Sequence, residues 1–386
     1  MTTNFAAAMR RAALSTRAYD PVEATRIIQD ALAQQTGFQQ SASDSKRPPS
    51  LRLIDSGAEV IPSSRTQYEP GQRKRLGDAL RILKEGKSRF RGFDTLRNRP
   101  VGTPPPPIAD GAQFIARSFT CAAGARSYKL YLPASAPTRP NGLIVMLHGC
   151  KQNPDDFASG AAMNTVAETH GLIVAYPSQN STANASSCWN WFSPQDQMRD
   201  RGEPAIIAGI TRELVSEFGI ADNRTFAAGL SAGGAMAAIM GQTYPDLYAA
   251  VGIHSGLAYG SATDVMSAFA TMRGDAPRNV QAPRARVRTI VFHGSADGLV
   301  HPSNAERVVA QAAPEHLLQK SASQRMHVNG RSCTRTEIAN AHGSPVVEYW
   351  LIEGAGHTWS GGHPSGTYTD VSGPNASMEM VRFFLN

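Results

Sequence analysis

The sequence lacks long apolar runs, and this excludes one broad class of protein. None of its apolar stretches approaches the ~20 residues that a helix needs to cross a bilayer, so we expect no transmembrane segment. Residues 1–35 contain arginines but no continuous apolar run of the kind found in secretory signals. We therefore expect a cytoplasmic protein in preference to a secreted one.

Cysteine is also scarce. Only four occur among 386 residues, at Cys121, Cys150, Cys188 and Cys333. Their number and spacing fit neither a disulfide scaffold nor a zinc-binding pattern. Stability must therefore come mainly from a buried apolar core, and a hydrophobic content of 41% is ordinary for a globular chain.

Excess positive charge is confined to the first quarter of the chain. Residues 1–100 contain 18 Lys and Arg against 10 Asp and Glu, whereas residues 101–386 contain 20 against 21. No nucleic-acid-binding motif accompanies the excess, so nucleic acid is not an expected partner. A solvated basic arm is the favoured interpretation, and contact with an anionic surface is the alternative.

The composition changes near residue 108, where we place a domain boundary. Residues 4–34 show helical spacing and predict a helical hairpin, and the linker after them is too poor in apolar residues to bury a core. The proline run 104–107 predicts a stiff, extended spacer. Residues 1–108 thus form a helical or disordered basic arm, and residues 109–386 form the folded domain.

Within 109–386, apolar runs typical of buried strands alternate with helical patterns. Strands separated by helices predict the α/β class, with a mostly parallel sheet covered by helices on both faces. The predicted strands of the parallel part are residues 143–147, 172–176, 224–228, 249–254, 288–292 and 346–352.

The stretch 229–233 reads Gly-Leu-Ser-Ala-Gly and lies between an apolar run and an Ala- and Met-rich helical run. A serine nucleophile held between a strand and a helix needs this pattern. The turn is so tight that the positions two before and two after the serine must be nearly free of side chain. Ser231 is therefore a candidate nucleophile, with an ordinary glycine-rich turn as the alternative.

An acid and a histidine follow Ser231 in the chain. Asp297 comes just past the apolar run 288–292, and His357 just past 346–352. Ser, Asp and His in this order, at the carboxyl ends of strands, are arranged as in an α/β-hydrolase. His357 would act as the base and Asp297 would orient it. The other acids considered, Asp264 and Glu353, have a less suitable sequence context.

Two backbone amides are candidates for the oxyanion hole. One belongs to Ala232, directly after the nucleophile, and the other to Cys150, in the loop after the first parallel strand. We expect His148 to shape this loop by side-chain hydrogen bonds. A metal site formed by His148, His357 and His363 is a weaker alternative, because no acidic or thiol ligand shares their spacing.

The loops near the candidate site contain aromatic residues and two of the cysteines. We interpret the aromatic residues as walls of an acyl-binding crevice, although each alone is more often a core residue. Cys150 and Cys188 could form a disulfide, but two buried thiols are the favoured state for a cytoplasmic protein. Residues 260–283 are a candidate lid or a surface helix. The four aromatic residues are Trp189, Trp191, Phe192 and Trp359.

With these motifs the chain resembles the poly(3-hydroxybutyrate) depolymerase family of esterases, close to type-1 feruloyl and acetylxylan esterases. The resemblance implies an α/β-hydrolase fold, a Ser/Asp/His triad, no cofactor and an ester substrate. Family members that attack solid polymer resemble secreted enzymes, which keeps an extracellular location as the alternative. The matching stretches are residues 147–150 with Gln152, 188–192, 229–234, 254–256, 293–294 with Asp297, and 354–359.

The function expected from this combination is hydrolysis of carboxylic esters through an acyl-enzyme on Ser231. Poly(3-hydroxybutyrate) or hydroxyalkanoate oligomers are the leading substrates, and feruloyl or acetylxylan ester hydrolysis is the alternative. A hypothesis from another class is a polyester-granule-associated binding protein in which the basic arm is functional and the hydrolase domain is silent.

Overall fold

The computed structural model describes residues 106, 108–136, 138–275, 287–313, 317 and 321–386. Nearly all of the predicted arm, including the hairpin 4–34, lies outside these residues, and the boundary near residue 108 stays a prediction. The last third of the candidate lid, residues 276–283, also lies outside them.

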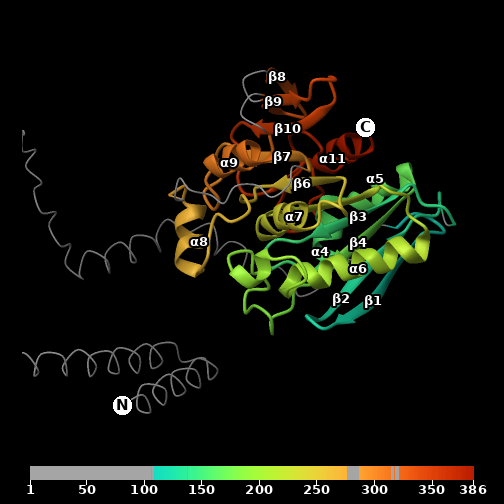
Figure 1. Cartoon of the computed structure of the whole chain (residues 1–386). Coiled ribbons are helices and arrows are strands. Elements are labelled where there is room, and N and C mark those ends of the chain that lie inside the picture. The colour runs from blue at the N-terminus through green and yellow to red at the C-terminus, as the bar shows by residue number, and fades with distance from the viewer. Residues whose placement is uncertain (1–105, 107, 137, 276–286, 314–316, 318–320) are drawn as a thin grey trace, which may run out of the picture. The chain divides into compact units, whose positions relative to one another are not determined.

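One mixed sheet organises the described part of the chain, in the order β1-β2-β4-β3-β5-β6-β7-β10-β9-β8 (Figure 1). The six strands from β4 to β10 in this order are parallel neighbours, whereas the pairs β1-β2, β2-β4, β10-β9 and β9-β8 are antiparallel. The strands are β1 (Gln113–Cys121), β2 (Gly124–Leu132), β3 (Gly142–Leu147), β4 (Leu172–Pro177), β5 (Thr225–Leu230), β6 (Ala250–His254), β7 (Arg288–Gly294), β8 (Ala322–Val328), β9 (Arg331–Ala339) and β10 (Pro345–Ile352).

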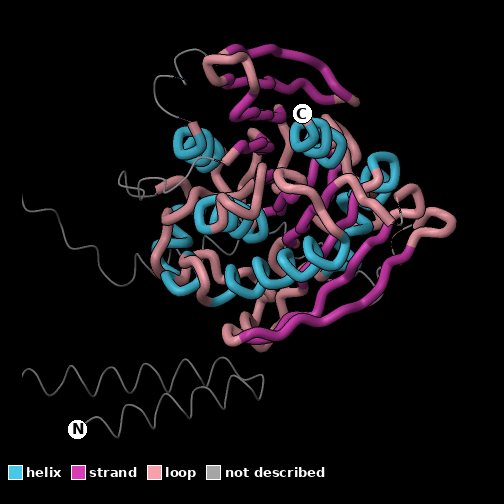
Figure 2. Tube along the Cα trace, turned by 45° about the vertical axis from the view of Figure 1, so that its right-hand side comes forward, coloured by secondary structure: helices cyan, strands magenta, loops and turns pink. Residues whose placement is uncertain are grey.

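Helices cover both faces of this sheet, which confirms the predicted fold class (Figure 2). On one face, apolar side chains of α6 (Gly202–Phe218), α7 (Ala232–Thr243) and α9 (Ser303–Ala312) join one core cluster. On the other face, α4 (Pro154–Ala161), α5 (Met163–His170) and α11 (Ala376–Leu385) join a second cluster. The central strands β3, β4, β5 and β6 are buried along their whole length, as their apolar sequences require.

Strands β8 and β9 were not predicted from the sequence. Most residues of β8 are exposed, and it has no apolar run because it forms an edge of the sheet. The sequence of residues 161–170 has helical spacing throughout, but in the structure Ala162, with φ of 51°, separates α4 from α5. A periodic apolar pattern reveals buried elements, whereas polar edge strands give no such signal.

The parallel register brings the ends of several strands to one edge of the sheet. Leu147 at the end of β3 pairs with Gly229 near the end of β5, and Leu230 pairs with His254 at the end of β6. Gly294 of β7 pairs with Ile352 of β10. The loops that carry Ser231, Asp297 and His357 therefore leave the sheet at the same carboxyl edge.

Candidate active site

Ser231 lies at the turn between β5 and α7, in a backbone conformation that side-chain-bearing residues rarely adopt. Its φ is 58° and its ψ is −118°. The turn is held because the Ser231 amide donates to the carbonyl of His254 at 2.9 Å, and the Ala235 amide donates to the Ser231 carbonyl at 2.9 Å. Strained backbone at such a turn is typical of a functional site.

The two glycines of the motif are required by close backbone contacts. A Cβ atom at Gly233 would lie 1.9 Å from the carbonyl oxygen of Leu147. A Cβ atom at Gly229 would lie 2.4 Å from the carbonyl carbon of Gly233. Neither obstacle is a flexible side chain that could move aside. The spacing of these glycines around Ser231 therefore follows from the packing of α7 against the end of β3.

Asp297 and His357 meet directly. Nδ1 of His357 donates to Oδ2 of Asp297 at 2.7 Å, and the amides of Leu299 and Val300 donate to Oδ1, each at 2.9 Å. Asp297 is buried and the His357 side chain nearly so. Nε2 of His357 makes no hydrogen bond to any residue that the structure describes, and it is the ring nitrogen left to accept a proton.

The charge of Asp297 is stabilised despite its burial. Burial alone would raise the pKa of this carboxyl, but hydrogen bonds from His293 and His357 outweigh it and hold the pKa well below its usual range. Nε2 of His293 lies 3.4 Å from Oδ2 of Asp297 and 2.8 Å from the carbonyl oxygen of Val300. No role was expected for His293, although its place near the end of a predicted strand, four residues before Asp297, could be read from the sequence.

The alternative acids are engaged elsewhere. Asp264 is an exposed N-cap of α8 (Val265–Met272) and accepts from the amide of Ser267 at 2.7 Å. Glu353 pairs with Arg325 at 2.9 Å on the surface. Only Asp297, of the three acids considered, contacts His357.

The loop after β3 is ordered by its own side chains. The imidazole of His148, which is fully buried, donates from Nδ1 to the Gly149 carbonyl at 2.8 Å and accepts at Nε2 from the Gln179 amide at 3.1 Å. Burial lowers the pKa of His148 to about 4, so the ring is neutral near pH 7. The Gly149 amide donates to the side-chain carbonyl of Gln152 at 2.9 Å.

This loop lies against the nucleophile turn and leaves two amides free. A Cβ atom at Gly149 would be 3.7 Å from Cβ of Ser231. The Ala232 amide is the first of α7, where no carbonyl one turn earlier is available to accept it. Within the described residues, no hydrogen bond is made by the Cys150 amide either. Both predicted oxyanion donors are thus unpaired at the edge that carries Ser231.

Cys150 and Cys188 form a disulfide, so the favoured expectation of two thiols was wrong. The expectation of thiols rested on a cytoplasmic location, which determines whether cysteines are oxidised. It carried no information on whether the fold brings these two cysteines together. Next to the bridge, the Lys151 amide donates to the Ser186 carbonyl at 2.9 Å. The other two cysteines, Cys121 and Cys333, are free.

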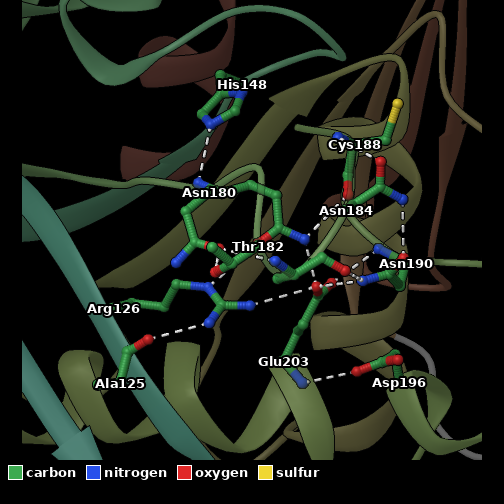
Figure 3. A network of polar contacts seen from close by, with 12 residues as sticks. Ala125, Arg126, His148, Asn180, Thr182, Asn184, Cys188, Asn190, Asp196 and Glu203 are labelled. Carbon is green, nitrogen blue, oxygen red and sulfur yellow. Dashed lines mark hydrogen bonds and ion pairs between the residues drawn. The ribbon is translucent and has the colours of Figure 1, made fainter. Parts of the chain in front are cut away.

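A buried polar network supports the segment that carries Cys188 (Figure 3). Glu203, at the start of α6, accepts from the amide of Asn190 at 2.8 Å and from its side chain at 2.7 Å. Arg126 of β2 reaches Glu203 at 3.5 Å, and Gln179 donates both to Glu203 and to the Cys188 carbonyl. Burial raises the pKa of Glu203, and these partners compensate part of that cost.

The four predicted wall residues do not share one location. Trp359 is fully buried; its indole donates to Ser377 at 3.2 Å and stacks on His254, so its assignment to a crevice wall was wrong. Trp189 is also fully buried and donates to the His148 carbonyl at 3.1 Å, so it supports the loop after β3 (residues 148–152, the proposed oxyanion loop) and lines no crevice. Both indoles point into the core, where each N–H has a buried acceptor.

Phe192 stays a candidate for substrate contact, whereas Trp191, which packs beside it, is buried in a core cluster. Their rings pack edge to face with centroids 5.8 Å apart, and Phe192 is only partly buried. Residues 265–272 of the candidate lid form α8, whose outer face exposes Val265, Met266 and Phe269.

The described part of the chain contains no helix with the length and apolar character of a membrane span. In the same residues, no group of three His, Cys, Asp or Glu side chains is arranged to hold a metal ion.

The sheet and the helices on its two faces define an α/β-hydrolase fold, in which the strained turn of Ser231 and the Asp297–His357 pair lie at one edge of the sheet. Residues 126–339 match the family described as esterase PHB depolymerase, which is more than half of the chain. The chain therefore belongs to this family.

Sequence relatives carry related names. The chain is 33% identical over 241 residues to poly(3-hydroxyalkanoate) depolymerase C of Paucimonas lemoignei, covering 58% of this chain and 56% of the relative. It is 30% identical over 200 residues to feruloyl esterase B of Thermothelomyces thermophilus, and this match covers 47% of this chain and 67% of the relative. The alignment thus spans little more than half of the depolymerase.

Among solved structures, acetyl xylan esterase from Aspergillus awamori has a similar fold. Its TM-score is 0.51 at 21% identity, covering 64% of this chain and 93% of that structure. At this identity the similarity concerns the fold alone.

Proposed function

We propose that the protein is a serine esterase that hydrolyses carboxylic esters, with poly(3-hydroxybutyrate) or hydroxyalkanoate oligomers as leading substrates. The observation that carries this proposal is the 2.7 Å hydrogen bond between His357 and Asp297, at the sheet edge that also carries the strained turn of Ser231. A triad is recognised by the roles and contacts of its members, and the direct contact between the proposed base and the proposed orienting acid supports this assignment.

In the proposed reaction, Ser231 attacks the ester carbonyl while Nε2 of His357 takes its proton. The Nδ1–H bond to Asp297 holds the imidazole in the tautomer that leaves Nε2 free and stabilises the ring when it becomes charged. The amides of Cys150 and Ala232 donate to the developing oxyanion. His357 then returns the proton to the leaving alcohol, and water hydrolyses the acyl-enzyme by the same steps.

The names of the sequence relatives indicate which substrate classes to test. A depolymerase of poly(3-hydroxyalkanoate) at 33% identity favours hydroxyalkanoate esters. A feruloyl esterase at 30% identity supports the second candidate, a feruloyl or acetylxylan esterase. Relative turnover of hydroxybutyrate oligomers, methyl ferulate and acetylated xylan separates the two candidates.

Replacement of Ser231 tests the proposal as a whole. We expect Ser231→Ala to lower kcat for p-nitrophenyl butyrate by about a thousandfold or more, with unchanged thermal unfolding. Ser323→Ala, on the exposed edge strand β8, is the matched control and should keep full activity. Undiminished turnover by Ser231→Ala would refute the mechanism. A complete lack of ester hydrolysis by the unmodified protein would favour the silent-domain hypothesis.

A further inference from the structure

A tyrosine that no motif singled out lies against His357. The rings of Tyr368 and His357 pack edge to face, with centroids 6.4 Å apart and an angle of 83° between their planes. Tyr368 is only partly buried, and its hydroxyl makes no hydrogen bond to any residue within the described ranges. An accessible phenol with an unused donor therefore stands beside the base of the proposed reaction.

The backbone at Tyr368 is held in an uncommon conformation. Its φ is 52°, in the left-handed region that residues with a Cβ atom seldom occupy. The Tyr368 carbonyl accepts from the amide of Trp359 at 2.7 Å, where β11 (Trp359–Ser360) pairs with β12 (Thr369–Asp370). Such a conformation persists only where the surrounding structure determines it, and it is found preferentially at functional sites.

The surrounding structure that fixes this turn is built on one buried carboxylate. Asp156 accepts from the amide of Thr367 at 2.9 Å and from the hydroxyl of the same residue. It also accepts from the side chain of Gln152 at 3.1 Å, and the carbonyl end of that side chain accepts from the Gly149 amide at 2.9 Å. The turn before Tyr368 and the oxyanion loop are therefore fastened to the same group.

We propose that Tyr368 is a specificity-determining residue that contacts the alcohol portion of the ester. This inference rests on the proposed function. His357 must return its proton to the leaving alcohol, so the leaving oxygen has to come within hydrogen-bond reach of that ring. A phenol packed on the same ring is placed beside the group attached to this oxygen.

The chemistry of a hydroxyalkanoate oligomer gives the hydroxyl of Tyr368 a partner. There the leaving alcohol is itself a hydroxyacyl unit, and its carboxyl oxygens accept hydrogen bonds. A p-nitrophenyl leaving group places an aromatic ring at this position instead. Tyr368 should thus favour esters whose alcohol carries an oxygen acceptor close to the leaving oxygen.

The test compares two substrates that share an acyl group and differ only in the alcohol. These are the linear dimer of 3-hydroxybutyrate and p-nitrophenyl 3-hydroxybutyrate. Tyr368→Phe keeps the ring and removes the hydroxyl. We expect kcat/KM for the dimer to fall about tenfold, the effect typical of one lost hydrogen bond to a charged or strongly polar group, while the value for the p-nitrophenyl ester stays within about twofold. Tyr349→Phe, on β10, is the matched control.

The outcomes separate this inference from the function it rests on. The role of Tyr368 would be overturned if Tyr368→Phe had the same kcat/KM as the unmodified protein on both substrates, or if it lost kcat/KM equally on both. Either result would leave the esterase proposal intact. Absence of Ser231-dependent turnover in the unmodified protein would overturn both.

Discussion

His293, in the last part of strand β7, and Asp297, in the loop after this strand, are in contact: Nε2 of His293 lies 3.4 Å from Oδ2 of Asp297. The same nitrogen is 2.8 Å from the carbonyl oxygen of Val300, so one N–H of His293 lies close to both the Val300 carbonyl and the Asp297 carboxylate. The oxygen of Asp297 that holds His357 is therefore held in turn by a fully buried residue.

Removal of this support should weaken catalysis without weakening substrate binding. We expect His293→Leu to lower kcat about tenfold at nearly constant KM, because Asp297 loses a hydrogen bond that orients it toward His357. Steady-state kinetics on p-nitrophenyl butyrate measure this split. His342→Gln, at an exposed turn, is the control. A rise in KM at constant kcat would contradict the expected role.

The close contact at Gly233 predicts a large loss of stability. Gly233→Ala should lower the free energy of unfolding by more than about 3 kcal/mol, because its Cβ would meet the Leu147 carbonyl and the end of β3 would have to shift. Urea unfolding gives the difference. Gly298→Ala, with no atom within 4 Å of its new Cβ, should change stability by less than about 0.5 kcal/mol. A stable Gly233→Ala variant would show that the turn can open.

The disulfide predicts sensitivity to reduction. Loss of the bridge across a separation of 38 residues should lower the free energy of unfolding by about 3–4 kcal/mol. It should also lower kcat, since Cys150 carries a proposed oxyanion donor. Unfolding and kinetics with and without a reductant measure both effects, which Cys188→Ser should reproduce. Cys121→Ser, at a free thiol, should respond to the reductant as the unmodified protein does. Full activity after verified reduction would rule out the catalytic part.

Two buried histidines predict that acid destabilises the fold. Burial lowers the pKa of His148 from 6.5 to about 4 and that of His254 from 6.5 to about 3. Between these values and 6.5 the unfolded chain binds protons that the native state does not. Stability is therefore complete above pH 6.5 and is lost as the pH falls toward 4. His148 alone should contribute roughly 2–3 kcal/mol to this loss.

The measurement is the free energy of unfolding in urea at a series of pH values from 7 to 4. His148→Asn should give a shallower pH dependence than the unmodified protein, whereas the exposed control His342→Asn should not change it. An unchanged slope in His148→Asn would mean that the imidazole of His148 is protonated in the native state.

The sequence was sufficient for the buried framework and for the residues at the ends of its strands. The glycines around Ser231 could be interpreted because the contacts that require them follow from the strand-turn-helix geometry itself. The pairing of Asp297 with His357 followed from parallel strands that end at one edge.

Features that depend on non-local packing could not be predicted in the same way. Trp359 is only two residues from His357 in sequence, yet its side chain lies in the core, where Ser377 accepts its N–H. Tyr368 gave no signal, because the residue before it, Thr367, is held by Asp156, more than 200 residues earlier in the chain. Local sequence pattern contains no information about such partners.

The single carboxylate of Asp156 has a consequence for any attempt to redesign this protein as an esterase. It anchors the oxyanion loop through Gln152 and the Tyr368 turn through Thr367. Changes that reshape one of these segments will therefore be transmitted to the other, and rate and substrate preference will tend to vary together. Libraries aimed at a new leaving group should keep Asp156 and Gln152 fixed and vary position 368 alone.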